Sequence, residues 1–293
     1  MHIKILQDLI DKIRGKKNYF MFLEEYAIKL WGLKKKQNNF HTLILGSSHI
    51  ATGYIPEEGE YNCATSSQDL YSSYKIYEVS NNKGLKNIIL SFSDFAPWNC
   101  LIDSPVSYIT CYLKILLNIN SINRKKLAQK ATKSYGVIKK RIDKFIVGCE
   151  KKHTFGNYKG EWLDYPKTLY EEDMQDSIYR AERFNYNFMT RMHTQMVFLQ
   201  NILDKTKKYN QNVYIVITPI IDEQYKKNIL PHSQIFKNLY NICENYSNVK
   251  ILNYFNALEF DVQDFYDWQH LNYSGALKLT KLVKDEIYGG NNV

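Results

Sequence analysis

The chain has 293 residues, of which 44% are hydrophobic and 24% are charged, and its formal net charge at pH 7 is +9. These proportions are those of a folded globular protein and exclude a disordered or fibrous one. The basic residues fall in short scattered clusters without a recognised nucleic-acid-binding module, so we expect no nucleic-acid partner. Attraction to an anionic glycan, a nucleotide-activated donor or an anionic membrane surface stays open as an alternative.

The cysteine content and the hydropathy of the chain indicate in which cellular compartment the protein is located. The five cysteines are odd in number and show no CxxC spacing, which argues against a disulfide framework or a metal site and favours a reducing compartment. The first ten residues carry charges that a signal peptide core would exclude, and no apolar run reaches the roughly 18–20 residues of a membrane span. We therefore expect a cytoplasmic protein, with peripheral contact at the inner membrane as the alternative.

Residues 1–40 are predicted to form a helical N-terminal extension. Apolar residues recur at helical spacing from Ile3 to Ile13, and a second apolar group lies between Phe20 and Trp31. We expect these helices to pack on the main domain, with docking on a membrane surface or a partner as the alternative.

Beyond residue 40, short apolar runs alternate with helical patterns. The apolar pattern predicts a final helix from about Ser274 and another helix over residues 65–79. Strand and helix alternation implies a parallel sheet that is covered on both faces. The predicted strands cover residues 41–45, 61–64, 86–92, 212–218 and 249–254.

A long segment separates the third predicted strand from the fourth. Residues 96–210 are too many for a simple connection, and their pattern is mostly helical. An insertion after the carboxyl end of a strand lies above the edge of the sheet where ligands bind in open α/β folds. The sequence therefore predicts one α/β domain over residues 41–293, with a helical cap at about 96–210.

Two fragments far apart in the chain carry the candidate chemistry. Gly46-Ser47-Ser48-His49 follows an apolar run, so its serines are placed where a buried strand turns into a helix. Asp267-Trp268-Gln269-His270 supplies a carboxylate three residues before a histidine, and a helical pattern follows. A serine on such a turn, together with an acid and a base on one late loop, is the residue set of nucleophilic acyl chemistry.

In this context the chain resembles the SGNH (GDSL-like) hydrolase superfamily. Within it, the chain looks closest to the branch that contains bacterial surface-polysaccharide O-acyltransferases and the D-alanyl-transfer proteins of teichoic acid. The resemblance covers residues 41–95 and 212–288, and it implies a three-layer, flavodoxin-like fold with a mostly parallel five-stranded sheet. It rests on Leu-Ile-Leu-Gly-Ser-Ser-His at 43–49, Tyr-Asn-Cys-Ala-Thr-Ser-Ser-Gln-Asp at 61–69, Ile-Leu-Ser-Phe-Ser-Asp at 89–94, Val-Ile-Thr-Pro at 216–219 and Asp-Trp-Gln-His at 267–270.

The resemblance assigns roles to single residues. Ser48 matches the family nucleophile, His270 the general base and Asp267 the acid that orients the base. Ser47 fills a slot that is often aspartate, and it stays open as an alternative nucleophile. His49 is expected to point away from the site.

The oxyanion-binding positions depart from the family pattern. Ser67, or else Ala64, stands where the family has a glycine, and Ser93 stands near the place of its asparagine. Backbone N–H groups of Ser48 and Ser67 can still bind an oxyanion, and Ser93 offers a hydroxyl. Asn62 is interpreted as holding the loop near the nucleophile, and together with Ser47 it is also counted among the candidate oxyanion- or substrate-binding residues.

From these residues and the resemblance we expect serine-dependent acyl transfer on a carbohydrate through an acyl-Ser48 intermediate. The enzyme would be an O-acetyl- or acyltransferase or an esterase acting on a bacterial surface polysaccharide or its precursor. No bound cofactor is expected, although an acyl-CoA is a candidate acyl donor. The alternative is a catalytically weak or inactive SGNH-like protein that binds or assembles glycans.

Overall fold

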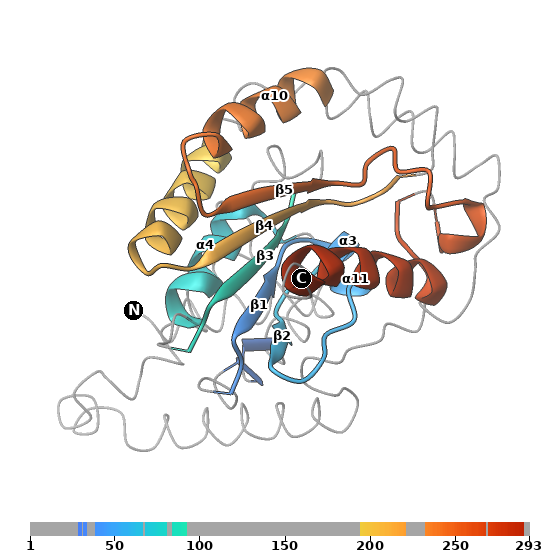
Figure 1. Cartoon of the computed structure of the whole chain (residues 1–293), viewed down its shortest axis with the longest axis horizontal. Coiled ribbons are helices and arrows are strands. Elements are labelled where there is room, and N and C mark those ends of the chain that lie inside the picture. The colour runs from blue at the N-terminus through green and yellow to red at the C-terminus, as the bar shows by residue number, and fades with distance from the viewer. Residues whose placement is uncertain are drawn as a thin grey trace, which may run out of the picture.

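The computed structural model describes residues 29–30, 32–33, 39–66, 68–80, 84–92, 194–220, 232–267 and 269–289. The described strands form one five-stranded sheet in the order β2-β1-β3-β4-β5, and every neighbouring pair is parallel (Figure 1). The strands are β1 (Thr42–Leu45), β2 (Glu60–Asn62), β3 (Asn87–Ser91), β4 (Asn212–Ile217) and β5 (Val249–Asn253). The α/β fold class predicted from the sequence is therefore confirmed.

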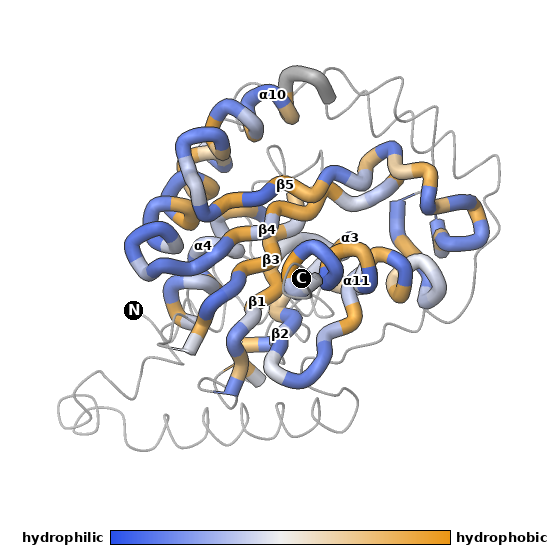
Figure 2. The backbone as a smooth tube through the Cα atoms, in the orientation of Figure 1, coloured by the Kyte–Doolittle hydropathy of each residue, from blue (hydrophilic) through white to orange (hydrophobic). Residues whose placement is uncertain are grey.

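The central strands are buried on both faces, which is why they read as continuous apolar runs in the sequence. Side chains of one strand alternate between the two faces. Leu43 and Ile88 join the hydrophobic core on one side of the sheet, whereas Ile44 and Ile89 join the core on the other. Figure 2 shows these strands as the mainly hydrophobic centre of the described chain.

Helices cover both faces, so the molecule has three layers (Figure 1). One face carries α4 (Leu70–Ser80), a helix over residues 194–208 and α10 (His232–Cys243). The other carries α3 (Ser48–Gly53) and α11 (Tyr273–Tyr288), which contact each other. This is the three-layer, flavodoxin-like arrangement that the sequence predicted.

The predicted strand ends differ from the observed ones by at most two residues. The larger difference is α4, which begins at Leu70 and not at residue 65. Thr65 starts a turn in which its carbonyl accepts a hydrogen bond from the Gln68 N–H at 3.2 Å. Asp69 then accepts the N–H of Ser72 at 2.8 Å, as an N-terminal capping residue does. A backbone turn and a side-chain cap therefore replace the first helical turn.

The ends of two predicted segments pack into the core of the sheet. Leu199 and Leu203, from the last part of residues 96–210, are buried in the same cluster as β3 and β4. Leu30 and Leu33, from the predicted N-terminal extension, are buried there as well. Residues 1–28, 31 and 34–38 of the predicted extension and residues 96–193 of the predicted cap lie outside the described residues, so the domain boundaries stay predictions. Within the described ranges, no helix is both long and apolar enough to cross a bilayer.

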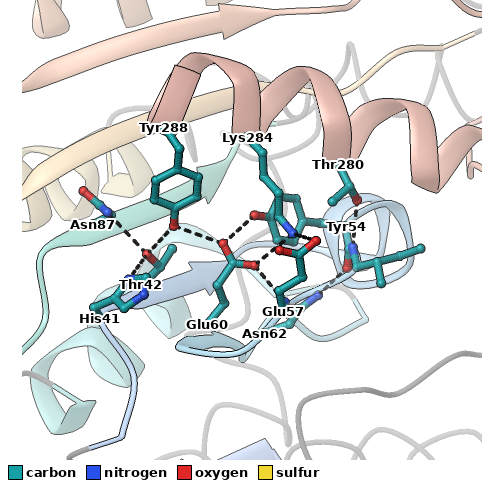
Figure 3. Close-up of polar contacts among 11 residues, drawn as sticks. His41, Thr42, Tyr54, Glu57, Glu60, Asn62, Asn87, Thr280, Lys284 and Tyr288 are labelled. Carbon is teal, nitrogen blue, oxygen red and sulfur yellow. Dashed lines mark hydrogen bonds and ion pairs between the residues drawn. The ribbon is translucent and has the colours of Figure 1, made fainter. Parts of the chain in front are cut away.

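A buried carboxylate ties α11 to the amino-terminal edge of the sheet (Figure 3). Glu60, the first residue of β2, accepts hydrogen bonds from the hydroxyls of Tyr54 at 2.9 Å and Tyr288 at 3.1 Å. Its second oxygen accepts the N–H of Glu57 at 3.0 Å and lies 3.7 Å from Lys284 Nζ. Tyr288 and Lys284 belong to α11, so these contacts fix the helix that follows the loop of the candidate site.

Candidate active site

The chain turns sharply after β1, and the turn requires a glycine. Gly46 has φ +134°, a backbone conformation that residues with a side chain rarely adopt. A Cβ atom there would lie 2.5 Å from Cβ of Ser91, which is closer than such atoms approach. The turn places Ser47 and Ser48 at the start of α3, at the carboxyl end of β1. Because β1 lies between β2 and β3, this is the point of an open α/β sheet where ligands bind.

The segment that carries Asp267 and His270 lies in the loop between β5 and α11, and both of its ends are held in place. Phe265 and Leu271 pair through an isolated antiparallel bridge, which closes residues 266–270 into a loop. Asn272 then caps α11: its Oδ1 accepts the N–H of Gly275 at 3.1 Å, and its Nδ2 donates to the carbonyl of Phe265 at 3.3 Å. The loop is therefore a fixed support for the side chains that it carries.

Three of the predicted side chains form one hydrogen-bonded chain. His270 Nε2 lies 2.9 Å from Ser48 Oγ, and His270 Nδ1 lies 2.9 Å from both carboxylate oxygens of Asp267. Because a carboxylate only accepts, Nδ1 carries the hydrogen, and the lone pair of Nε2 faces the Ser48 hydroxyl. That is the tautomer in which a histidine can remove a proton from a serine.

The environment of Asp267 keeps its carboxylate charged. Burial by itself raises the pKa of this group, but the hydrogen bond from the His270 ring and those from the backbone N–H groups of Gln269 and His270 outweigh burial and lower it. Asp267 is therefore ionised at neutral pH. A negative charge at this position stabilises a positively charged His270 ring.

A second chain of hydrogen bonds runs beside the first. His49 Nδ1 lies 2.8 Å from Ser47 Oγ, and His49 Nε2 lies 3.0 Å from Gln269 Oε1. The His49 ring stacks on the His270 ring, with 5.0 Å between the centroids and 15° between the planes. The expectation that His49 points away from the site is wrong. Its contact with Gln269, 220 residues away, follows from the approach of the two segments that carry Ser48 and His270.

The two serines have very different partners. Burial and the charge of His270 lower the pKa of His49 to about 3, so His49 cannot accept a proton at neutral pH. His49 therefore cannot act as the base that would remove a proton from the Ser47 hydroxyl. Ser48 faces His270, whose other nitrogen is bound to a carboxylate. Of the two hydroxyls, Ser48 is the one that this geometry can activate.

Asn62 is fully used in holding α3. Its Nδ2 donates to the carbonyls of Ile50 at 3.3 Å, Ala51 at 3.3 Å and Tyr54 at 3.1 Å. Its Oδ1 accepts the N–H of Ala64 at 3.1 Å. Asn62 therefore closes the C-terminal end of the short helix that begins with Ser48, a structural role like the one expected from the sequence.

Ser67 and Ser93, the predicted oxyanion-binding residues, lie outside the described residues, so their role stays a prediction. Trp268, between Asp267 and Gln269, lies outside them as well. Within the described part of the chain, no group of three or more His, Cys, Asp or Glu side chains could hold a metal ion.

Comparisons with known proteins leave the family open. No family model matches the chain, and no curated protein matches it. One solved structure that matches is that of a candidate platelet activating factor from Streptococcus pneumonia. It is 11% identical, with a TM-score of 0.47, and the match covers 98% of this chain and 99% of that one. A likeness this remote assigns the chain neither a family nor an activity.

Proposed function

We propose that this protein is an SGNH-type serine enzyme that transfers an acyl group to a carbohydrate or hydrolyses an acyl ester on one. The observation that carries the proposal is the hydrogen-bonded chain from Ser48 through His270 to Asp267 at the carboxyl edge of the sheet. The sequence resemblance to the SGNH superfamily supports the same reading of these three residues.

In the proposed mechanism, Ser48 Oγ attacks the acyl carbonyl carbon while His270 Nε2 takes the serine proton. Asp267 stabilises the ring that has become positively charged. The tetrahedral intermediate collapses, and His270 gives the proton to the departing group, which leaves an acyl-Ser48 ester. His270 then removes a proton from a sugar hydroxyl or from water, whose oxygen attacks the ester, and the same proton returns to Ser48.

The developing oxyanion needs hydrogen-bond donors. The backbone N–H of Ser48 is a donor that does not depend on the side chain, and the resemblance adds the backbone of Ser67 and the hydroxyl of Ser93. Loss of one such donor costs about 100- to 1,000-fold in turnover. The departures from the family pattern at these positions are thus expected to lower the rate without removing the nucleophile or the base.

The acyl acceptor in this proposal is a sugar hydroxyl of a bacterial surface polysaccharide or its precursor, and the donor is an activated acyl compound such as an acyl-CoA. The branch of the superfamily that the sequence resembles supports both choices. The same three residues serve transfer to a sugar and transfer to water, so the access of water to the acyl-Ser48 ester decides between the two outcomes.

Turnover of p-nitrophenyl acetate, with and without added oligosaccharide, tests this function. We expect the wild-type protein to release p-nitrophenol and to pass the acetyl group to the oligosaccharide if it is a transferase, or to water if it is an esterase. We expect Ser48→Ala to release no p-nitrophenol above background. Equal rates in the two proteins would rule out the proposed chemistry. A protein that binds the oligosaccharide without any turnover would instead match the glycan-binding alternative.

A further inference from the structure

His49 connects the two segments that carry Ser48 and His270. It contacts Ser47 at 2.8 Å and Gln269 at 3.0 Å. Ser47 directly precedes Ser48, and Gln269 directly precedes His270. This second bridge therefore runs parallel to the Ser48–His270 hydrogen bond and lies one residue away from it in each segment.

The partners of His49 select one form of its ring. Gln269 Oε1 can only accept, so Nε2 of His49 carries the hydrogen. Nδ1 is then an acceptor, and the hydroxyl of Ser47 donates to it. Both ring nitrogens of a neutral His49 are thereby satisfied, as a buried polar side chain requires.

The stacked rings add a second constraint. The His49 ring lies almost parallel to the His270 ring, so it limits the movement of His270 toward that side. Because the pKa of His49 is lowered to about 3, His49 stays neutral when His270 takes up a proton, and no second positive charge opposes that step. Asp267, which is bound to Nδ1 of His270, supplies the charge that stabilises the protonated His270 ring.

We propose that His49 is a positioning residue that holds the His270 ring against Ser48 Oγ through its bridge to Ser47 and Gln269 and through its stacked ring. This inference rests on the proposed function, because positioning affects a rate only where Ser48 and His270 react. Without the bridge, the Ser48–His270 hydrogen bond must hold these parts of the two segments together, and the His270 ring has more freedom to move away from Ser48 Oγ. A displacement of about 1 Å in such a site can cost roughly 100-fold in rate.

Two substitutions separate the parts of this arrangement. His49→Phe keeps a ring beside His270 and removes both hydrogen bonds, whereas Gln269→Ala cuts one end of the bridge. We expect each to slow the second-order reaction of Ser48 with a fluorophosphonate about 10- to 100-fold. Because both changes break the same bridge, the double variant should be little slower than the slower single variant.

The matched control is Leu203→Ala, which truncates a buried side chain of the helix over residues 194–208, on the other face of the sheet, and leaves the bridge intact. It is expected to lower the unfolding temperature and to leave the fluorophosphonate rate unchanged at temperatures where the variant is folded. A folded His49→Phe protein that reacts at the wild-type rate would overturn the inference. So would a loss of rate in Leu203→Ala equal to that in His49→Phe.

Nitrogen NMR of histidine-labelled protein gives a readout that does not depend on the reaction. We expect the His49 ring to stay neutral with its hydrogen on Nε2 between about pH 5 and 9, and we expect the His270 signals to shift or broaden in both variants. Unchanged His270 signals in both variants would overturn the positioning role, whether or not the wild-type protein reacts. A wild-type protein that does not react, with His270 signals that do change, would overturn the proposed function alone.

Discussion

The hydroxyl oxygen of Ser48 lies 2.9 Å from Nε2 of His270, although 222 residues separate the two in the sequence. Ser48 follows β1, and His270 follows β5, so the parallel sheet and the loop before α11 bring them to the same edge. Their geometry depends on a glycine turn on one side and on a capped loop on the other. Each of these supports can be tested separately.

The carboxylate of Asp267 is expected to matter through the tautomer of His270. In Asp267→Asn the amide oxygen can still accept the backbone N–H groups, so the loop should keep its shape. An amide NH₂ group facing Nδ1 would instead favour the wrong ring tautomer, and we expect the rate of ester cleavage to fall about 10,000-fold. Asp261→Asn is the control, because it changes an exposed side chain that caps the preceding 3-10 helix η2 (Val262–Asp264). A loss of less than about tenfold in Asp267→Asn would contradict this role.

The turn at Gly46 is expected to tolerate no side chain. Gly46→Ala combines a positive φ with a contact to Ser91, so we expect a loss of about 1–3 kcal/mol in the free energy of unfolding and a displaced Ser48. Denaturant titration and the fluorophosphonate rate measure the two effects. Gly289→Ala is the control, because its Cβ would lie an ordinary 3.9 Å from the nearest atom. Equal stability of the two variants would count against the strained turn.

The network around Glu60 should contribute to stability and not to reactivity. Glu60→Ala removes the acceptor of the buried Tyr54 hydroxyl and of the Tyr288 hydroxyl, whereas Lys284 keeps its ion pair with Glu57, so we expect a loss of about 1–3 kcal/mol. Glu286→Ala, which breaks an exposed ion pair with Lys250, should cost less than about 1 kcal/mol. Chemical denaturation of the two variants distinguishes them, and similar losses would refute the structural role of Glu60.

Acid should weaken the contact between α4 and the helix over residues 194–208. Burial raises the pKa of Glu78, but hydrogen bonds from Lys205, Lys75 and Tyr74 outweigh burial and lower it to about 2. A carboxyl whose pKa is depressed on folding stabilises the protein above its unfolded pKa of 4.5, and this contribution is lost as the pH falls toward 2. Because the side chain is partly exposed, we expect a contribution of about 1 kcal/mol.

The test compares the free energy of unfolding at about pH 6 and about pH 3 in the wild-type protein and in Glu78→Gln. The wild-type protein should lose more stability between the two values than the variant does. The same loss in both proteins would mean that Glu78 does not contribute in this way.

Most of the fold could be predicted from the sequence because its central strands, β1 and β3, are buried along their whole length. Such strands give short apolar runs, and each predicted run corresponds to an observed strand. The start of α4 could not be predicted in this way. There, the turn from Thr65 to Gln68 is closed by a backbone hydrogen bond and the cap at Asp69 by a side-chain one, and apolar periodicity registers neither.

Some residues of the candidate site could also be predicted from their local sequence, whereas others could not. Ser48, Asp267 and His270 could be named because each stands in a recognisable local context, and the structure brings their side chains together. Their catalytic roles stay predictions. His49 was missed because its role depends on Gln269 and on a stacked ring, neither of which leaves a signal in the local sequence.

The most direct test of the central claim is the site of fluorophosphonate modification, determined by peptide mapping under conditions that label a control esterase. The account predicts one adduct on Ser48 in the wild-type protein, none on Ser48→Ala, and a slower adduct on Ser48 in Ser47→Ala. An intact protein with no adduct, or an adduct on Ser47 in place of Ser48, would contradict it.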